Sequence, residues 1–148
     1  MRPPERGRDE AGQVSVLIIG FAAVLLLAIA VVIDASAAYL QRQGLDTLAD
    51  GAALRGADLG ATGEDVYRGG VTHDDLELTA AKARQAVHAY LADVGAHRKY
   101  PGLTAQVTVT DTTVEVRLTA PVDLPLSIPG SPERPTVGAT GAAVVSPD

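Results

Sequence analysis

The chain has 148 residues, a formal net charge of -6 and no cysteine. This length is enough for one small domain. The acidic balance disfavours nucleic acid as a partner, because a phosphate backbone carries the same sign of charge. Without cysteine, disulfides and thiolate sites are excluded.

The first predicted element is a membrane segment over residues 13–33. Its sequence, QVSVLIIGFAAVLLLAIAVVI, contains no charged residue. A helix of this length rises about 30 Å, which matches the hydrocarbon core of a bilayer. In lipid a single segment satisfies its own backbone hydrogen bonds only as a helix. The side chains that we expect to face lipid include Val14, Leu17, Ile18, Phe21, Leu25, Leu26, Ile29, Val32 and Ile33.

Two other interpretations of this segment are a buried core helix and a cleaved secretory signal. A buried core helix would be apolar on every face in a domain too small to surround it. A cleaved secretory signal fits the small residues Ala35-Ser36-Ala37, although the apolar run is longer than the usual ~7–15 residues. Cleavage after Ala37, which would release a secreted binding module, is kept as the alternative.

The flanking charges predict the orientation. Arg2, Arg6 and Arg8 precede the apolar run, whereas Arg42 is the only basic residue in the 20 positions after it. The positive-inside rule therefore places a basic leader, residues 1–12, in the cytoplasm. Everything from Asp34 onward is expected outside the cytoplasm.

Residues 34–59 are predicted to extend the same helix beyond the membrane. The segment contains no proline, and apolar residues recur with spacings near 3.6. These residues are Ala38, Leu45, Leu48, Ala49 and Ala52. Gly44, Gly51 and Gly56 weaken the helix by about 1 kcal/mol each relative to alanine, so a bend is expected near Gly44.

The remaining residues, 60–148, are predicted to form an outer α+β domain. After a loop over residues 60–70, a helix is expected over 73–95, capped by Thr72 and stopped by Gly95. Its apolar face would consist of Leu76, Ala80, Ala83, Val87, Tyr90, Leu91 and Val94.

The apolar period then changes to 2. Strands are expected over residues 103–110 and 113–120, joined by Asp111-Thr112 as an antiparallel hairpin. Five prolines between Pro121 and Pro135 predict an irregular crossing loop. A third strand is expected over residues 136–146, weakened by two glycines. The helices would cover one face of this small sheet.

No catalytic, cofactor or metal site is predicted, and we expect no enzymatic activity. His73, Asp74 and Asp75 fit a solvated first helical turn better than a metal site, and no HExxH pattern occurs. The glycines at 56, 60 and 63 lack the Lys-Ser/Thr of a phosphate loop. Gly56-xxx-Gly60 is interpreted as a helix terminus rather than a close packing contact.

The N-terminal segment resembles a known family over residues 7–57. It opens with Gly12-Gln13-Val14-Ser15-Val16-Leu17, and its apolar helix ends at Val32-Ile33-Asp34. Tyr39-Leu40-Gln41-Arg42-Gln43 and the run LDTLADGAAL over residues 45–54 follow. This order is similar to the TadE/TadG-like proteins of Flp (tight-adherence) pilus assembly, with their G-Q-V-x-V opening and ALADAAAL stretch.

The resemblance implies a pilin-like, membrane-anchored accessory component of a bacterial pilus or secretion machine. Its expected partners are the lipid bilayer and pilus or secretion-platform membrane proteins, and its location is the bacterial cell membrane. Substrates of prepilin peptidase usually carry Glu five residues after the cleavage glycine, where this chain has Leu17. The resemblance also implies processing between Gly12 and Gln13 as a further alternative, which Leu17 disfavours.

Overall fold

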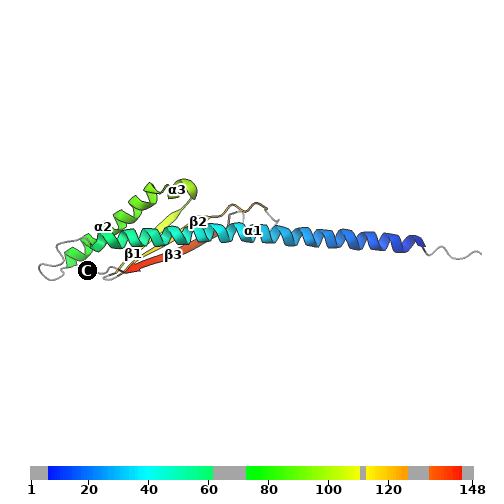
Figure 1. Cartoon of the computed structure of the whole chain (residues 1–148), viewed down its shortest axis with the longest axis horizontal. Helices are drawn as coiled ribbons and strands as arrows, with labels where there is room; N and C mark the ends of the chain where they lie inside the picture. Colours follow the sequence, from blue (N-terminus) through cyan, green and yellow to red (C-terminus); the bar gives the residue numbers. More distant parts are fainter. Residues whose placement is uncertain (1–6, 62–72, 111–112, 127–133, 145–148) are drawn as a thin grey trace, which may run out of the picture.

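A single helix dominates the molecule. The computed structural model describes residues 7–61, 73–110, 113–126 and 134–144. Helix α1, Gly7–Ala61, has 55 residues and therefore a length of about 80 Å. It begins inside the segment predicted as a leader and continues through Gly44, so the bend expected there is not found (Figure 1).

The predicted second helix is followed by a short third helix. We call the N-terminal, apolar half of α1 its inner half and the C-terminal half its outer half. Helix α2, His73–Asp93, runs back alongside the outer half, and a four-residue helix α3, Ala96–Lys99, follows it. Gly95 separates them with a φ of 67°, a left-handed conformation that favours glycine. The stop expected at Gly95 is thus confirmed, and α3 is the part that periodicity did not predict.

Three strands form one antiparallel sheet in the order β1-β2-β3. They are β1, Thr104–Val109; β2, Thr113–Pro121; and β3, Thr136–Val144. The predicted β1–β2 hairpin is confirmed, with Val109 opposite Val114 and the Thr110 N–H donating to the Thr113 carbonyl at 2.9 Å. Its expected turn, Asp111-Thr112, lies outside the described residues.

The two strands that the proline-rich segment joins are neighbours in the sheet, so the expectation of a crossing connection was wrong. β3 lies directly beside β2, and Pro121 stands opposite Thr136 in the register. Beyond this pair, the Val122 N–H donates to the Pro135 carbonyl at 2.8 Å. The connection therefore begins and ends at the same end of the sheet, as in a long hairpin.

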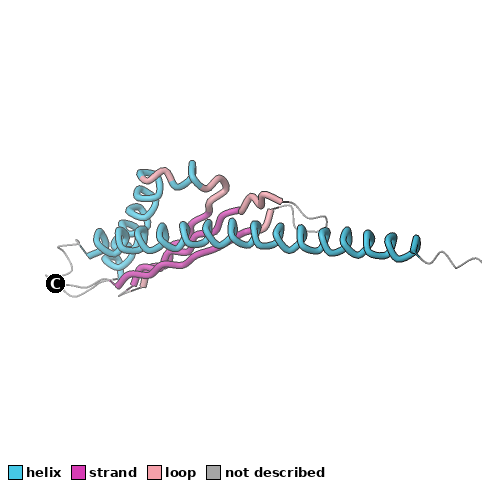
Figure 2. Tube along the Cα trace, turned by 45° about the vertical axis from the view of Figure 1, so that its right-hand side comes forward, coloured by secondary structure: helices cyan, strands magenta, loops and turns pink. Residues whose placement is uncertain are grey.

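The helices cover one sheet face, as the sequence predicted, and α1 lies over β3 and β2 (Figure 2). The core between these layers consists mainly of small and branched aliphatic side chains. Its fully buried members include Leu45, Ala49, Ala52, Ala53, Ala83, Val87, Leu91, Val114, Val116, Leu118 and Ala120. The apolar face predicted for α2 was wrong at one residue, because Val94 is 48% exposed. The Leu76 side chain lies outside the described part of the chain.

Three glycines in the part of α1 that carries the domain, Gly44, Gly51 and Gly56, are contact points. A β-carbon at Gly44 would overlap the Tyr100 hydroxyl group, and one at Gly51 would overlap that of Tyr90. At Gly56 it would lie 2.9 Å from a methyl group of Val87. The interpretation of Gly56 as part of a helix terminus is therefore wrong, since the residue allows α1, α2 and the sheet to approach closely.

Candidate membrane interface

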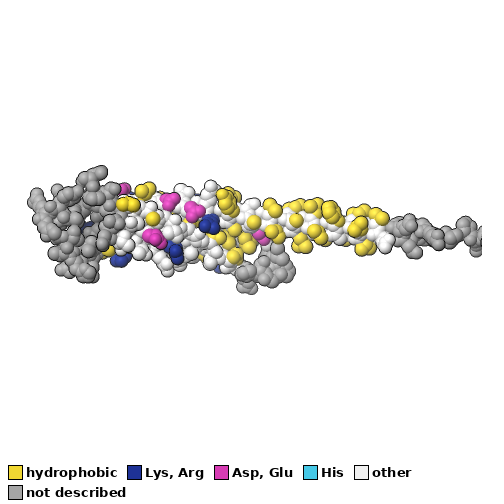
Figure 3. All heavy atoms as spheres, turned by 90° about the horizontal axis from the view of Figure 1, so that it is seen from below, with side chains coloured by type: hydrophobic (Ala, Val, Ile, Leu, Met, Phe, Trp, Pro, Cys, Tyr) yellow, Lys and Arg dark blue, Asp and Glu magenta, His cyan; other side chains and the backbone are white. Residues whose placement is uncertain are grey.

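The inner half of α1 presents apolar side chains on all sides. The nine residues predicted to face lipid are between 43% and 72% exposed. Space-filling atoms show hydrophobic side chains along this half of the helix and charged ones over the folded half (Figure 3). In water so large an apolar surface is unfavourable, at about 25 cal/mol per Å².

This half of α1 is long and apolar enough to cross a membrane, and none of its apolar window is buried inside the protein. A core helix of a water-soluble domain would pass the same test of length and composition, but it would be covered by neighbours. The buried-helix interpretation is therefore contradicted. The leader glycine, Gly12, and Gln13 lie within α1 and are exposed.

The folded domain reaches the end of the apolar stretch through one hydrogen bond. Asp34 is the first charged residue after Ile33, yet its side chain is only 9% exposed. Its Oδ1 atom accepts the backbone N–H of Leu126 at 3.0 Å. A carboxylate that accepts a hydrogen bond makes one of the stronger kinds of hydrogen bond. The β2–β3 connection is thus held against α1 where the predicted membrane segment ends.

A second hydrogen bond lies two turns further along α1. The Gln41 side-chain amide Nε2 donates to the carbonyl of Pro121 at 2.7 Å. We call the two pairs, Asp34–Leu126 and Gln41–Pro121, the junction. Sequence reasoning missed the junction because its partners are 92 and 80 residues apart. The only available signal was a lone carboxylate next to an apolar run.

Replacing Asp34 with alanine should loosen the junction. The Leu126 N–H would lose an acceptor worth about 1.5–3 kcal/mol, so its amide exchange should accelerate by about ten- to a hundredfold. Hydrogen exchange followed by mass spectrometry on the full chain in detergent measures this. Asp34→Asn keeps an oxygen acceptor and should exchange more slowly than Asp34→Ala.

The matched control for this experiment is Ser36→Ala. The Ser36 hydroxyl donates to the Val32 carbonyl within α1 at 2.7 Å and is exposed. Its loss should leave exchange at Leu126 unchanged. Equal protection of Leu126 in Asp34→Ala and in the unmodified protein would show that the hydrogen bond does not hold the connection.

The described residues include no group of three or more His, Cys, Asp or Glu side chains placed to hold a metal ion. His88 and His97 are both exposed and lie on different helices. The side chains of His73, Asp74 and Asp75 are outside the described part. The described residues thus contain two candidate functional features. These are the uncovered apolar half of α1 and its junction with the domain.

An uncovered apolar helix that continues into an α+β domain defines a candidate single-pass membrane protein. Residues 12–59 match the family model of putative Flp pilus-assembly TadE/G-like proteins. This confirms the resemblance of the N-terminal segment and connects the chain with pilus assembly. The match ends within α1, so α2 and the sheet lie outside it. No curated protein and no solved structure matches the chain.

Proposed function

We propose that this protein is a membrane-anchored, pilin-like accessory component of Flp/Tad-type pilus assembly or secretion. The observation that carries the proposal is the continuity of α1. Its inner half is bare and apolar, and its outer half is the spine on which α2 and the sheet pack. Force or movement applied to the anchor would therefore reach the domain without a flexible linker between them.

The role is associative rather than catalytic. The apolar half of α1 would hold the chain in the bilayer and contact pilus or secretion-platform membrane proteins. The α+β domain, outside the cytoplasm, would present its surface to further components. The arginines before the apolar run support an N-terminus in the cytoplasm.

The second candidate is a secreted binding module released after Ala37. The junction argues against it, because Asp34 lies before that site and holds Leu126. Cleavage would also cut α1 within a continuous helix. The fully buried part of α1 begins only at Leu45, so a released domain would keep most of its core. Secretion therefore remains the alternative to be tested.

Single-cysteine labelling tests the topology, since the chain has no cysteine of its own. Ala142 is exposed on β3, and Ala142→Cys should react with a membrane-impermeant maleimide in spheroplasts while the protein stays in the membrane pellet. Glu5→Cys, in the leader, should react only after the membrane is permeabilised. Labelling of Glu5→Cys in sealed spheroplasts would show the opposite orientation. Recovery of the Ala142→Cys protein in the medium would favour the secreted module.

A further inference from the structure

A polar cleft lies beside the junction. It has a volume of about 330 Å³ and is formed by α1, the turn after α3 and the two ends of the β2–β3 connection. Lys99 and Arg134 contribute basic side chains to its lining, and Asp123 contributes one carboxylate. The local balance is thus positive in a chain whose formal net charge is -6.

The cleft is close to the level at which the apolar stretch ends. Gln41, one of its lining residues, is eight positions after Ile33, a rise of about 12 Å along α1. The headgroup layer of a leaflet extends roughly 5–8 Å beyond the hydrocarbon core, and long basic side chains reach further. The connection that carries Asp123 continues to Leu126, which is tied to Asp34 and is 40% exposed.

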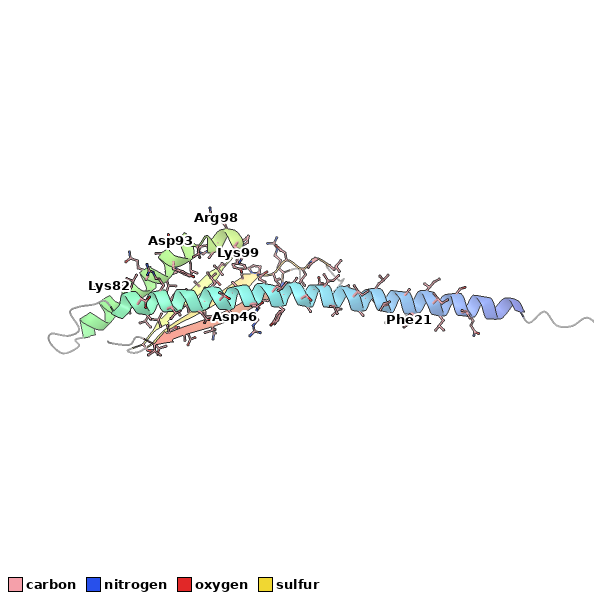
Figure 4. All side chains as sticks on the ribbon, viewed as in Figure 1. Phe21, Asp46, Lys82, Asp93, Arg98 and Lys99 are labelled. Atoms are coloured by element: carbon pink, nitrogen blue, oxygen red, sulfur yellow. The ribbon has the colours of Figure 1, made fainter. Side chains whose placement is uncertain are left out.

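Lys99, one of the basic residues of α3, is on the membrane side of the domain. Figure 4 shows Lys99 toward the apolar half of α1, whereas Lys82 lies near the opposite end of the domain. The Lys99 ammonium is 5.2 Å from the centre of the Tyr100 ring, and Tyr100 itself is buried against α1. This contact gives the Lys99 charge a fixed neighbour at the cleft wall.

We infer that this cleft binds the phosphate group of an anionic phospholipid headgroup from the leaflet next to the domain. Ammonium and guanidinium groups are the usual partners of phosphate, and Gln41 already uses its amide on Pro121. The position of the cleft favours a lipid over a free phosphate ion, because a headgroup is delivered at that level by the bilayer. The inference rests on the proposed membrane anchoring by α1.

Native mass spectrometry of the full chain, released from micelles containing equal amounts of phosphatidylglycerol and phosphatidylcholine, tests this inference. The unmodified protein should retain phosphatidylglycerol in preference to phosphatidylcholine. The double variant Lys99→Gln/Arg134→Gln should lose that preference by about fivefold or more, since each basic residue near an anionic surface changes affinity by about fivefold. Circular dichroism checks that the variant is folded.

The matched control is Lys82→Gln/Arg84→Gln, which removes two exposed basic side chains from α2. This variant should keep the preference for phosphatidylglycerol. An equal loss of preference in both double variants would overturn the inference, because the preference would then depend on the net charge of the protein and not on the cleft. Displacement of the lipid by excess inorganic phosphate would also overturn it in favour of a soluble ligand. A chain that does not enter micelles at all would contradict the membrane anchor itself, whereas a micelle-bound chain without lipid preference would contradict only the cleft.

Discussion

Replacing Gly141 with alanine is expected to destabilise the folded domain by about 3 kcal/mol, at the upper end of the usual cost of overpacking. Gly141 is on β3 and faces α1 at a point where two backbones touch. A β-carbon there would lie 2.6 Å from the Ala49 carbonyl oxygen and 2.5 Å from the Asp50 nitrogen. Backbone atoms of a packed helix cannot rotate away, so α1 and the sheet must separate. Thermal unfolding of the full chain in detergent, followed by circular dichroism, measures the change.

Gly138→Ala, on the same strand, is the matched control. A β-carbon at Gly138 would meet a methyl group of Thr119 at 2.9 Å on the exposed sheet face. That side chain lies at the sheet surface and can turn at the cost of its hydroxyl contact with Thr104, so the expected loss is about 1 kcal/mol and is partly offset by the stiffer backbone of alanine. Equal unfolding temperatures of the two variants would contradict the close approach of β3 to α1 at Gly141.

The second large effect is expected from charge in the apolar half of α1. Arginine near the centre of a membrane helix costs about 3 kcal/mol, so Leu25→Arg/Leu26→Arg should oppose insertion by about 6 kcal/mol. Both leucines are more than half exposed, so the described residues place little around them that could compensate the charge. The fraction of protein that stays in membranes after an alkaline carbonate wash should fall steeply.

The control places the same substitutions on the other half of the same helix. Leu54 and Leu59 are exposed by 58% and 43% in the part of α1 that carries the domain. Leu54→Arg/Leu59→Arg should stay in the membrane pellet as the unmodified protein does. Equal retention of both double variants would show that residues 13–33 do not hold the protein in the bilayer.

Local patterns in the sequence predicted most of the secondary structure. Alternation at residues 103–110 and 113–120 predicted the hairpin, and the 3.6-residue period after Asp34 predicted the burial of Leu45, Ala49 and Ala52. These features depend on neighbours along the chain, which a sequence shows directly. The α+β class followed from the same change of period.

Contacts between distant segments could not be predicted in this way. Gly44, Gly51 and Gly56 were interpreted as weak points of a helix, because nothing local indicates that Tyr100, Tyr90 and Val87 approach them. The proline-rich connection was expected to cross the sheet. Its return beside β2 is consistent with the small inward residues of β3, Ala139, Gly141 and Ala143, which let α1 lie close.

The candidate interface was predicted in one part and missed in the other. Composition alone identifies the nine residues predicted to face lipid, and the structure leaves them exposed. The junction and the cleft depend on tertiary contacts across 80 residues or more, so no motif indicates them. Asp34 shows the difference, since the sequence marks only the end of the apolar run at this residue.

The N-terminal sequence of the protein recovered from carbonate-washed membranes tests the central claim most directly. If α1 is at once the anchor and the spine of the domain, the pellet contains chains that still carry residues 13–33, whether they start in the leader or at Gln13. A mature protein that begins near Ala38 and leaves with the wash would contradict this account.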